Sequence, residues 1–504
     1  MDEVTRGDIG IYFFTIFPLL ILIPGHLIFM SFFGKTKEMP FDFYQRIFLK
    51  ILLTMILSSS IGLVLFSLGC FKMLYLIYGN LVISLLFTII KKYKITHIYP
   101  ISWGIQPWQA IFVVILILGM FLHYRPNEIY FGDSIQAWNA QFGFYLSKSG
   151  KWNIWNDFNI SKLPLFSMWL TYFSSLFGPK VMFYANSIFS SILILAAYSF
   201  GKFLVNRCFG LLFCMFFAFH WQSIWQSHHN LANTLDLVWI FGFLISIINI
   251  KNINFNFWSV LGLICALFSL ITHPVSVFIL IFIGLIFLII KKQEGSLPGE
   301  HSSYFKIILL AIGISVEYYL FKINNGFHLL YFSLPVIWIV FSFYLEHLFK
   351  QKLLFKYLVI LFMLFSFGGL LLAKQKDLFS RGSHGEYDFA KDIHEEISKA
   401  DWVYSDDNSI VSLFYYLFHF EINSLVGDQN DINSEKMFII DDLIQKGQTV
   451  YYIQSKNDWA KEFFVTKTKS ILSIRNKLEK SDNIVSILEI EGINDEAFCS
   501  DSCL

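Results

Sequence analysis

The chain has 504 residues, of which 56% are hydrophobic, 19% aromatic and 15% charged. Soluble globular proteins carry about 25% charged residues, so this composition excludes an ordinary soluble enzyme. With 29 Gly, 11 Pro and 6 Cys, the composition also excludes a collagen, a disordered chain and a disulfide scaffold. The formal net charge of +1 hides a division, because residues 374–504 carry a net −10 and residues 1–373 a net +11. These numbers predict a basic, apolar part followed by an acidic, polar tail.

Apolar runs long enough to cross a bilayer recur along residues 1–373. A transmembrane helix needs roughly 20 largely apolar residues. Pro274 disfavours helix at the residue before it, so we divide the run 257–290 into two spans there. About twelve spans are expected, near residues 10–33, 47–69, 72–91, 108–123, 181–205, 209–221, 234–250, 257–272, 274–290, 305–321, 327–346 and 354–373.

The distribution of Lys and Arg predicts the orientation of these spans. Basic residues concentrate in loops that follow alternate spans, and such loops face the cytoplasm. The N-terminus and the acidic tail are then expected outside the cytoplasm. The basic loop residues are Lys35, Lys37, Arg46, Lys91, Lys92, Lys94, Lys202, Arg207, Lys291, Lys292, Lys350, Lys352 and Lys356.

The predicted domains are N-terminal spans (1–123), an exocytoplasmic loop (124–180), the remaining membrane core (181–373) and an exocytoplasmic tail (374–504). The tail has the pattern of a small α/β domain. "DWVYS", "TVYYIQS" and "VSILEIEG" are rich in strand formers, and "SEKMFIIDDLIQKG" has helical apolar spacing and ends in glycine. The last two cysteines, Cys499 and Cys503, fit either a local disulfide or two free thiols. The fold class is therefore an α-helical polytopic membrane protein with a small C-terminal α/β domain.

The exocytoplasmic loop carries the first candidate for chemistry. Asp133 follows a glycine about ten residues after the fourth span. After Asp133 in the sequence, Trp138, Phe142 and Tyr145 recur at helical spacing, which predicts an amphipathic helix along the membrane surface. An aspartate in this position is typical of a helix N-cap. Beside an interfacial helix it is also placed to act as a general base on a membrane-bound substrate.

Two further charges lie close to the membrane on the same side. Lys162 precedes an apolar, proline-containing return, where it fits either a snorkelling lysine or a cation that holds an anionic head group. Asp236 opens the span at 234–250. It fits either a capping residue or a functional acid, because ionisable groups inside the membrane are costly and commonly functional.

The outer histidines are the remaining candidates. His273 lies between two apolar half-runs and fits either a turn cap or a phosphate ligand. His228 and His229 are adjacent, whereas helical metal ligands need a spacing of three or four, so a zinc site would require His220 as well. We therefore predict no metal site.

The candidate residues and the segments around them resemble, in their order along the chain, the GT-C superfamily of membrane glycosyltransferases. The resemblance is closest to the protein O-mannosyltransferase-like and aminoarabinose-transferase-like group of that superfamily. The resemblance runs over roughly residues 120–346. Three departures stand out: Asp133 is followed by Ser134 instead of glutamate, Lys162 precedes a single proline, and His273 replaces a lysine. The matching segments are "GDSIQAWNAQFGFYLSKSGKW", "SKLPLFSMWLTYFSSLFG", Leu235-Asp236, "LITHPVSVFIL" and "HLLYFSLPVIWIVFSF".

The resemblance implies transfer of a sugar from a polyprenyl-phosphate donor to a lipid, glycan or protein acceptor, on the exocytoplasmic face of a bacterial plasma membrane. Asp133 would take the acceptor proton. Lys162 and His273 would stabilise the leaving phosphate, and Asp236 would orient Lys162 or the sugar. Attack from the face opposite the leaving group implies inversion at the anomeric carbon.

Candidate contacts to the acceptor or the sugar are Trp138, His228 and His229. No cofactor is required by this chemistry, a divalent cation remains an open alternative, and no nucleic-acid partner is expected. The competing interpretations are a multi-span transporter and another membrane transferase of envelope components. A transporter would place its polar cavity near the bilayer midplane, and it commonly contains internal repeats, of which we find none.

Overall fold

The computed structural model describes two compact units, one within Met1–Asn127 and Tyr145–Lys374 and one within Glu128–Phe144 and Gln375–Leu504. The described part is mainly helical, with 82% of its residues in helices, and it contains one small sheet. The four predicted domains and the boundaries between them stay predictions. The described residues are 22–33, 41–90, 107–123, 143, 146, 150, 164–177, 184–204, 206–227, 232–249, 255–272, 394–405, 411, 414, 421–425, 434–454, 464–467 and 486–493.

Three helices of the first unit are long and apolar enough to cross a membrane: α2 (Phe43–Ser67), α3 (Met73–Ile90) and α8 (Ala185–Leu204). Together with five shorter apolar helices, they coincide with eight of the twelve predicted runs. The other four runs, from residue 274 onward, lie outside the described residues, so the count of twelve stays a prediction. The shorter helices are Leu22–Phe33, α4 (Pro107–His123), α9 (Arg207–Phe219), α11 (Asn233–Asn249) and α12 (Phe255–Thr272).

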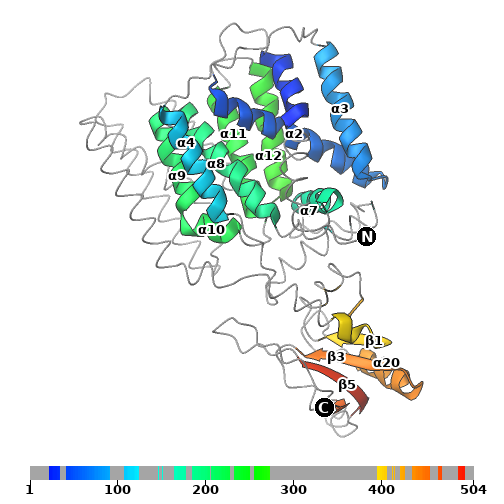
Figure 1. Cartoon of the computed structure of the whole chain (residues 1–504). Helices are drawn as coiled ribbons and strands as arrows, with labels where there is room; N and C mark the ends of the chain where they lie inside the picture. Colours follow the sequence, from blue (N-terminus) through cyan, green and yellow to red (C-terminus); the bar gives the residue numbers. More distant parts are fainter. Residues whose placement is uncertain are drawn as a thin grey trace, which may run out of the picture. The chain divides into compact units, whose positions relative to one another are not determined.

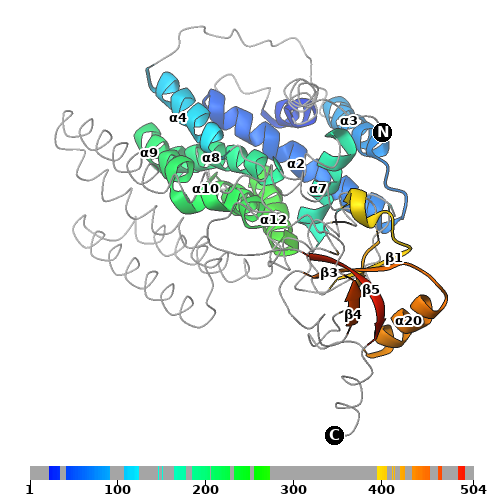
Figure 2. The same cartoon turned by 60° about the horizontal axis from the view of Figure 1, so that its bottom comes forward.

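Helix α8 is the central helix of the first unit. It packs against α2, α4, α9 and α11, and Figures 1 and 2 show it between these neighbours. It is buried along nearly its whole length, and its many small residues allow close approach of the surrounding helices. The approach is closest to α9, where a Cβ on Gly210 would lie 2.8 Å from the backbone oxygen of Tyr198.

Helix α3 buries mainly polar residues and exposes apolar ones, the opposite of a helix on the surface of a soluble protein. Its buried residues are Leu76, Asn80, Ser84 and Thr88, each four residues from the next and therefore on one face. The Asn80 side-chain amide donates to Ser58 Oγ of α2 at 2.9 Å. The other residues of α3 are mostly apolar and are exposed or half-exposed, which suits contact with lipid. The exposed residues are Leu74, Tyr75, Tyr78, Val82, Leu85, Leu86, Ile89 and Ile90.

The described helices of the first unit end in two chemically different regions. In the first region, which we call the basic end, Asp42 before α2 pairs with Lys202 in the last turn of α8. In the second region, the amide end, the end of α4, the start of α8, the short α10 (Trp221–Ser227), the start of α11 and the end of α12 meet through hydrogen bonds. Helix α7 (Pro164–Phe177) packs against α12, α2 and α8.

The second unit contains a five-stranded sheet of order β2-β1-β3-β5-β4. β1 pairs in parallel with β2 and β3, while β5 is antiparallel to β3 and β4. The three strand patterns expected in the tail are confirmed as β1, β3 and β5, and the short β2 and β4 are additional. The strands are β1 (Trp402–Ser405), β2 (Asn423–Ser424), β3 (Val450–Gln454), β4 (Phe464–Lys467) and β5 (Ser486–Ile493).

One helix, α20 (Ser434–Gln445), packs on this sheet, as its apolar spacing predicts. Met437, Ile440 and Leu443 face a core that includes Tyr452 and Leu488 of neighbouring strands. Gly447 follows the end of the helix, and its φ of +77° is the left-handed conformation that glycine adopts without strain. A small α/β unit in the tail is therefore confirmed for the described residues.

Candidate functional site

Asp236 is the one predicted site residue that the structure describes, and it is fully buried at the amide end. It lies in the first turn of α11, where the exposed backbone N–H groups of a helix favour a negative charge. Its Oδ1 accepts a hydrogen bond from Ser269 Oγ of α12 at 2.5 Å. Because a buried carboxylate is costly without donors, Ser269 and the helix start both stabilise it.

The carboxylate is separated from the interior of the bundle by aromatic rings. Trp239, one turn further along α11, packs against Phe268 with ring centroids 5.2 Å apart. Both side chains are buried. Asp236 therefore lies at the boundary between a polar layer at the helix ends and an apolar layer within the bundle.

The polar layer depends on a break in the helix after α9. At His220 the backbone leaves the helical conformation, with ψ of 128°, and α10 begins at the next residue. Gln226 of α10 is fully buried. Its Oε1 accepts from the Asn233 amide at 3.3 Å, and its backbone oxygen lies 3.5 Å from the Asn186 amide nitrogen.

These contacts connect three elements through amide side chains: the start of α8, α10 and the start of α11. Gln226 Nε2 has no hydrogen-bond partner among the described residues. Primary amides combine donor and acceptor atoms, which is the chemistry that recognises hydroxyl groups. One of these amides, Asn233, lies three residues before Asp236 in α11, so the amide group is close to this carboxylate in the chain.

The end of α4 joins the same region. His123, the last residue of α4, is buried and its Nε2 lies 3.1 Å from the backbone oxygen of Ala218 in α9. Ser227 Oγ donates to the Ile224 backbone oxygen at 2.6 Å and lies 3.5 Å from the His123 backbone oxygen. Helix α4 therefore ends at the amide end.

The remaining predicted site residues lie outside the described residues: Asp133, Trp138, Lys162, His228, His229 and His273. For Lys162, His228 and His273, a residue close by in the chain is described. Thr272, directly before His273, ends α12, and Ser227, directly before His228, ends α10. The helix α7 begins two residues after Lys162. Among the predicted residues, the structure thus places only Asp236, and it assigns Ser269 as its partner.

Sequence reasoning missed the buried amides Asn186, Gln226 and Asn233. Within residues 220–236, only the histidines and Asp236 were predicted as site residues. A signal is present, because Gln222, Gln226, Asn230 and Asn233 recur at spacings of three or four residues, and amides are costly to bury without partners.

In the described part of the chain, no group of three His, Cys, Asp or Glu side chains lies close enough to hold a metal ion. Cys214 and Cys265 are buried, Cys208 is half-buried and Cys70 is exposed. Cys499 and Cys503 lie outside the described residues.

No protein-family model, no curated protein and no solved structure matches the chain. The chemistry of the site therefore rests on its residues alone.

Proposed function

We propose that this protein is a membrane glycosyltransferase with a GT-C-like arrangement of about twelve spans. It transfers a sugar from a polyprenyl-phosphate donor to a lipid, glycan or protein acceptor, with inversion, on the exocytoplasmic face of a bacterial plasma membrane. One observation supports the proposal: Asp236 is fully buried in a polar layer at helix ends. The helices α4, α10 and α12, which precede predicted site residues in the chain, end in the same region.

Covalent geometry supports the grouping of His273 and Lys162 with Asp236. His273 follows Thr272 directly, so their Cα atoms are about 3.8 Å apart. Thr272 itself lies three residues after Ser269, the partner of Asp236. Pro164, two residues after Lys162 in the sequence, begins α7, and α7 packs on α12, the helix that carries Ser269.

The proposed chemistry divides into proton removal and charge stabilisation. Asp133 takes the proton of the acceptor hydroxyl as that oxygen attacks the anomeric carbon. The carbon–oxygen bond to the lipid phosphate breaks, and the released phosphate is stabilised by Lys162 and His273. Asp236 holds Lys162 or a sugar hydroxyl in position, with Ser269 fixing the carboxylate.

The experiment uses the purified chain in nanodiscs with a panel of polyprenyl-phosphate sugars, guided by mass spectrometry of envelope glycans, glycolipids and glycoproteins from a deletion strain. Asp133→Asn is expected to abolish transfer. Asp157→Asn, the same change in the same loop, is the matched control and keeps it. Equal activity of Asp133→Asn and the parent chain would refute the assignment of the base.

His273 gives a second measurement. An imidazolium binds phosphate more strongly than a neutral ring, and the unperturbed pKa of histidine is about 6.5. Transfer should therefore fall as the pH rises through this range. His273→Lys, which keeps its charge to higher pH, should remove that fall, whereas an unchanged profile would show that His273 does not contact the phosphate.

The transporter alternative predicts polar groups near the middle of the helices. The Asn80–Ser58 hydrogen bond lies near the middle of α3, away from the helix ends. In the contacts described for this pair of helices, the groups are uncharged amides and hydroxyls, which suit helix–helix association in lipid. Substrate uptake by proteoliposomes without any transferred sugar would favour the transporter.

A further inference from the structure

The basic end of the first unit concentrates positive charge. Arg46 and Lys50 lie on one face of α2, Lys202 lies in the last turn of α8, and Arg207 is the first residue of α9. We call these four residues the cation cluster. Helices α2, α4, α8 and α9 contain no Asp or Glu, so Asp42, the N-cap of α2, is their one neighbouring carboxylate among the described residues.

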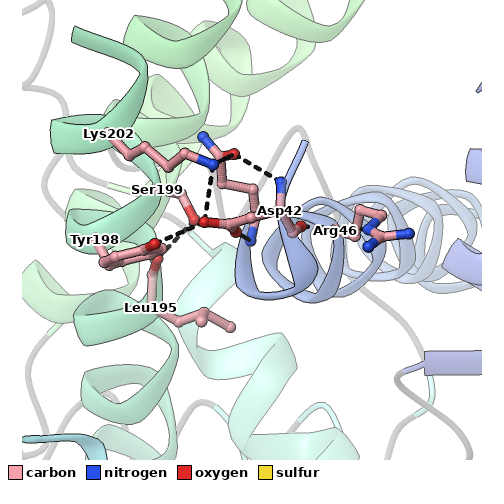
Figure 3. Close-up of polar contacts among 7 residues, drawn as sticks. Asp42, Arg46, Leu195, Tyr198, Ser199 and Lys202 are labelled. Atoms are coloured by element: carbon pink, nitrogen blue, oxygen red, sulfur yellow. Dashed lines mark hydrogen bonds and ion pairs between the residues drawn. The ribbon is translucent and has the colours of Figure 1, made fainter. Parts of the chain in front are cut away.

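Asp42 is already engaged on one side of the cluster. Its Oδ2 accepts from Lys202 Nζ at 2.8 Å and from the Tyr198 hydroxyl at 2.6 Å, as Figure 3 shows. Its Oδ1 accepts from the backbone N–H of Gln45, while the Gln45 side chain accepts a second hydrogen bond from Lys202 at 2.8 Å. One negative charge thus neutralises one of the four cations.

Arg46 and Lys50 keep their charge available. The Arg46 Nε donates to the backbone oxygen of Asp42 at 3.3 Å, and in Figure 3 its guanidinium points away from Lys202. Lys50, one turn further along, lies over the ring of Phe29 at 5.9 Å. Within the described residues, neither side chain has a carboxylate at ion-pair distance. The cluster and Asp42 together carry a net charge of about +3 at neutral pH.

Aromatic side chains indicate the depth of this region in a membrane. Arg207 lies over the ring of Trp108 at 4.7 Å, and Trp108 contacts Tyr44 and Tyr198. Trp and Tyr are enriched where lipid head groups meet the hydrocarbon. Beyond Trp108, α4 continues with an exposed apolar surface suited to acyl chains, at Ile111, Val114, Ile117, Leu118 and Phe121.

We propose that the cation cluster binds the phosphate of an anionic phospholipid, with the acyl chains along the exposed face of α4. Arginine suits this ligand because its guanidinium donates two parallel hydrogen bonds to phosphate oxygens. By the distribution of Lys and Arg, this end faces the cytoplasm, so the lipid belongs to the leaflet opposite the proposed sugar-transfer site. The site does not depend on the transfer reaction.

The test uses the full chain in phosphatidylcholine nanodiscs that contain increasing fractions of phosphatidylglycerol. Native mass spectrometry counts the phosphatidylglycerol molecules that stay bound, and thermal unfolding measures the stabilisation. We expect Arg46→Gln and Arg207→Gln each to weaken retention about tenfold, as loss of a charged hydrogen bond predicts. Arg207→Lys should lose less, because it keeps the charge.

Lys72→Gln is the matched control, since it also removes one positive charge but lies beyond the opposite end of α2. Retention should be unchanged in this variant. Equal losses in Lys72→Gln and Arg207→Gln would overturn the proposal, because they would indicate a nonspecific effect of net charge. Equal stabilisation by inorganic phosphate in pure phosphatidylcholine would likewise overturn the assignment to a lipid.

Discussion

Removal of the Asp42 charge should destabilise the bundle measurably. Asp42 and Lys202 are largely buried, with 7% and 16% of their side chains exposed. Removing one partner of a buried ion pair costs about 3–5 kcal/mol, and the partial exposure favours the lower end of that range. Asparagine is also a good N-cap, so Asp42→Asn keeps the cap of α2 and should cost about 3 kcal/mol. Asp42→Ala also loses the cap and should cost about 1 kcal/mol more.

The double variant Asp42→Asn/Lys202→Met separates the charge effect from the loss of packing. In it neither charge remains buried alone, so at least about 2 kcal/mol of the loss should be recovered. Equilibrium unfolding by SDS in mixed micelles, followed by the fluorescence of the 13 tryptophans, measures these free energies. Asn206→Ala, which removes the cap of α9 without a charge, is the control for capping alone.

The reasoning would be refuted if Asp42→Asn changed the free energy of unfolding by less than about 1 kcal/mol, the range of an exposed ion pair. It would also be refuted if adding Lys202→Met to Asp42→Asn lowered the free energy of unfolding further, by as much as Lys202→Met lowers it in the parent chain.

Three other substitutions test the fold. Ser269→Ala removes a donor to the buried Asp236 and should cost about 1.5–3 kcal/mol in the same SDS titration. Gly25→Ala would place a Cβ against the backbone oxygen of Lys50, so it should force the helices apart and lower the melting temperature, whereas an unchanged temperature would contradict the close approach. Gly447→Ala meets no neighbour within 4 Å, so its expected loss of about 1–2 kcal/mol, measured by hydrogen exchange of α20, comes from backbone strain alone.

The parts of the fold that depend on local signals could be predicted from the sequence. Helix α20 shows the reason, because its apolar residues recur at helical spacing and Gly447 ends it. The β3 and β5 segments are long enough to show their strand composition, whereas β2 has two residues and carries no pattern. The apolar helices were likewise visible, since a bilayer demands a long uniform run.

The packing between helices could not be predicted in the same way. Helices α3 and α8 are both apolar, yet α8 is central and α3 buries only one narrow face. At the candidate site, Asp236 was predicted because a charge is costly at the membrane. Gln226 was not, because its burial depends on the break in the helix at His220, and no local pattern in the sequence indicates the angle between α9 and α10.

The polar face that α3 turns inward, with Asn80, Ser84 and Thr88, affects how the protein behaves during extraction from a membrane. Lipid tails are as apolar as the outward face of α3, so burial of that face gives no drive for docking. Docking on α2 relies on close packing and on the Asn80–Ser58 hydrogen bond. If a detergent lets water reach the contact between α2 and α3, that water competes for the Asn80 amide and the Ser58 hydroxyl. During extraction from the membrane, α3 should therefore be the first of these two helices to separate, so short-chain detergents should yield a chain that is soluble yet incompletely assembled.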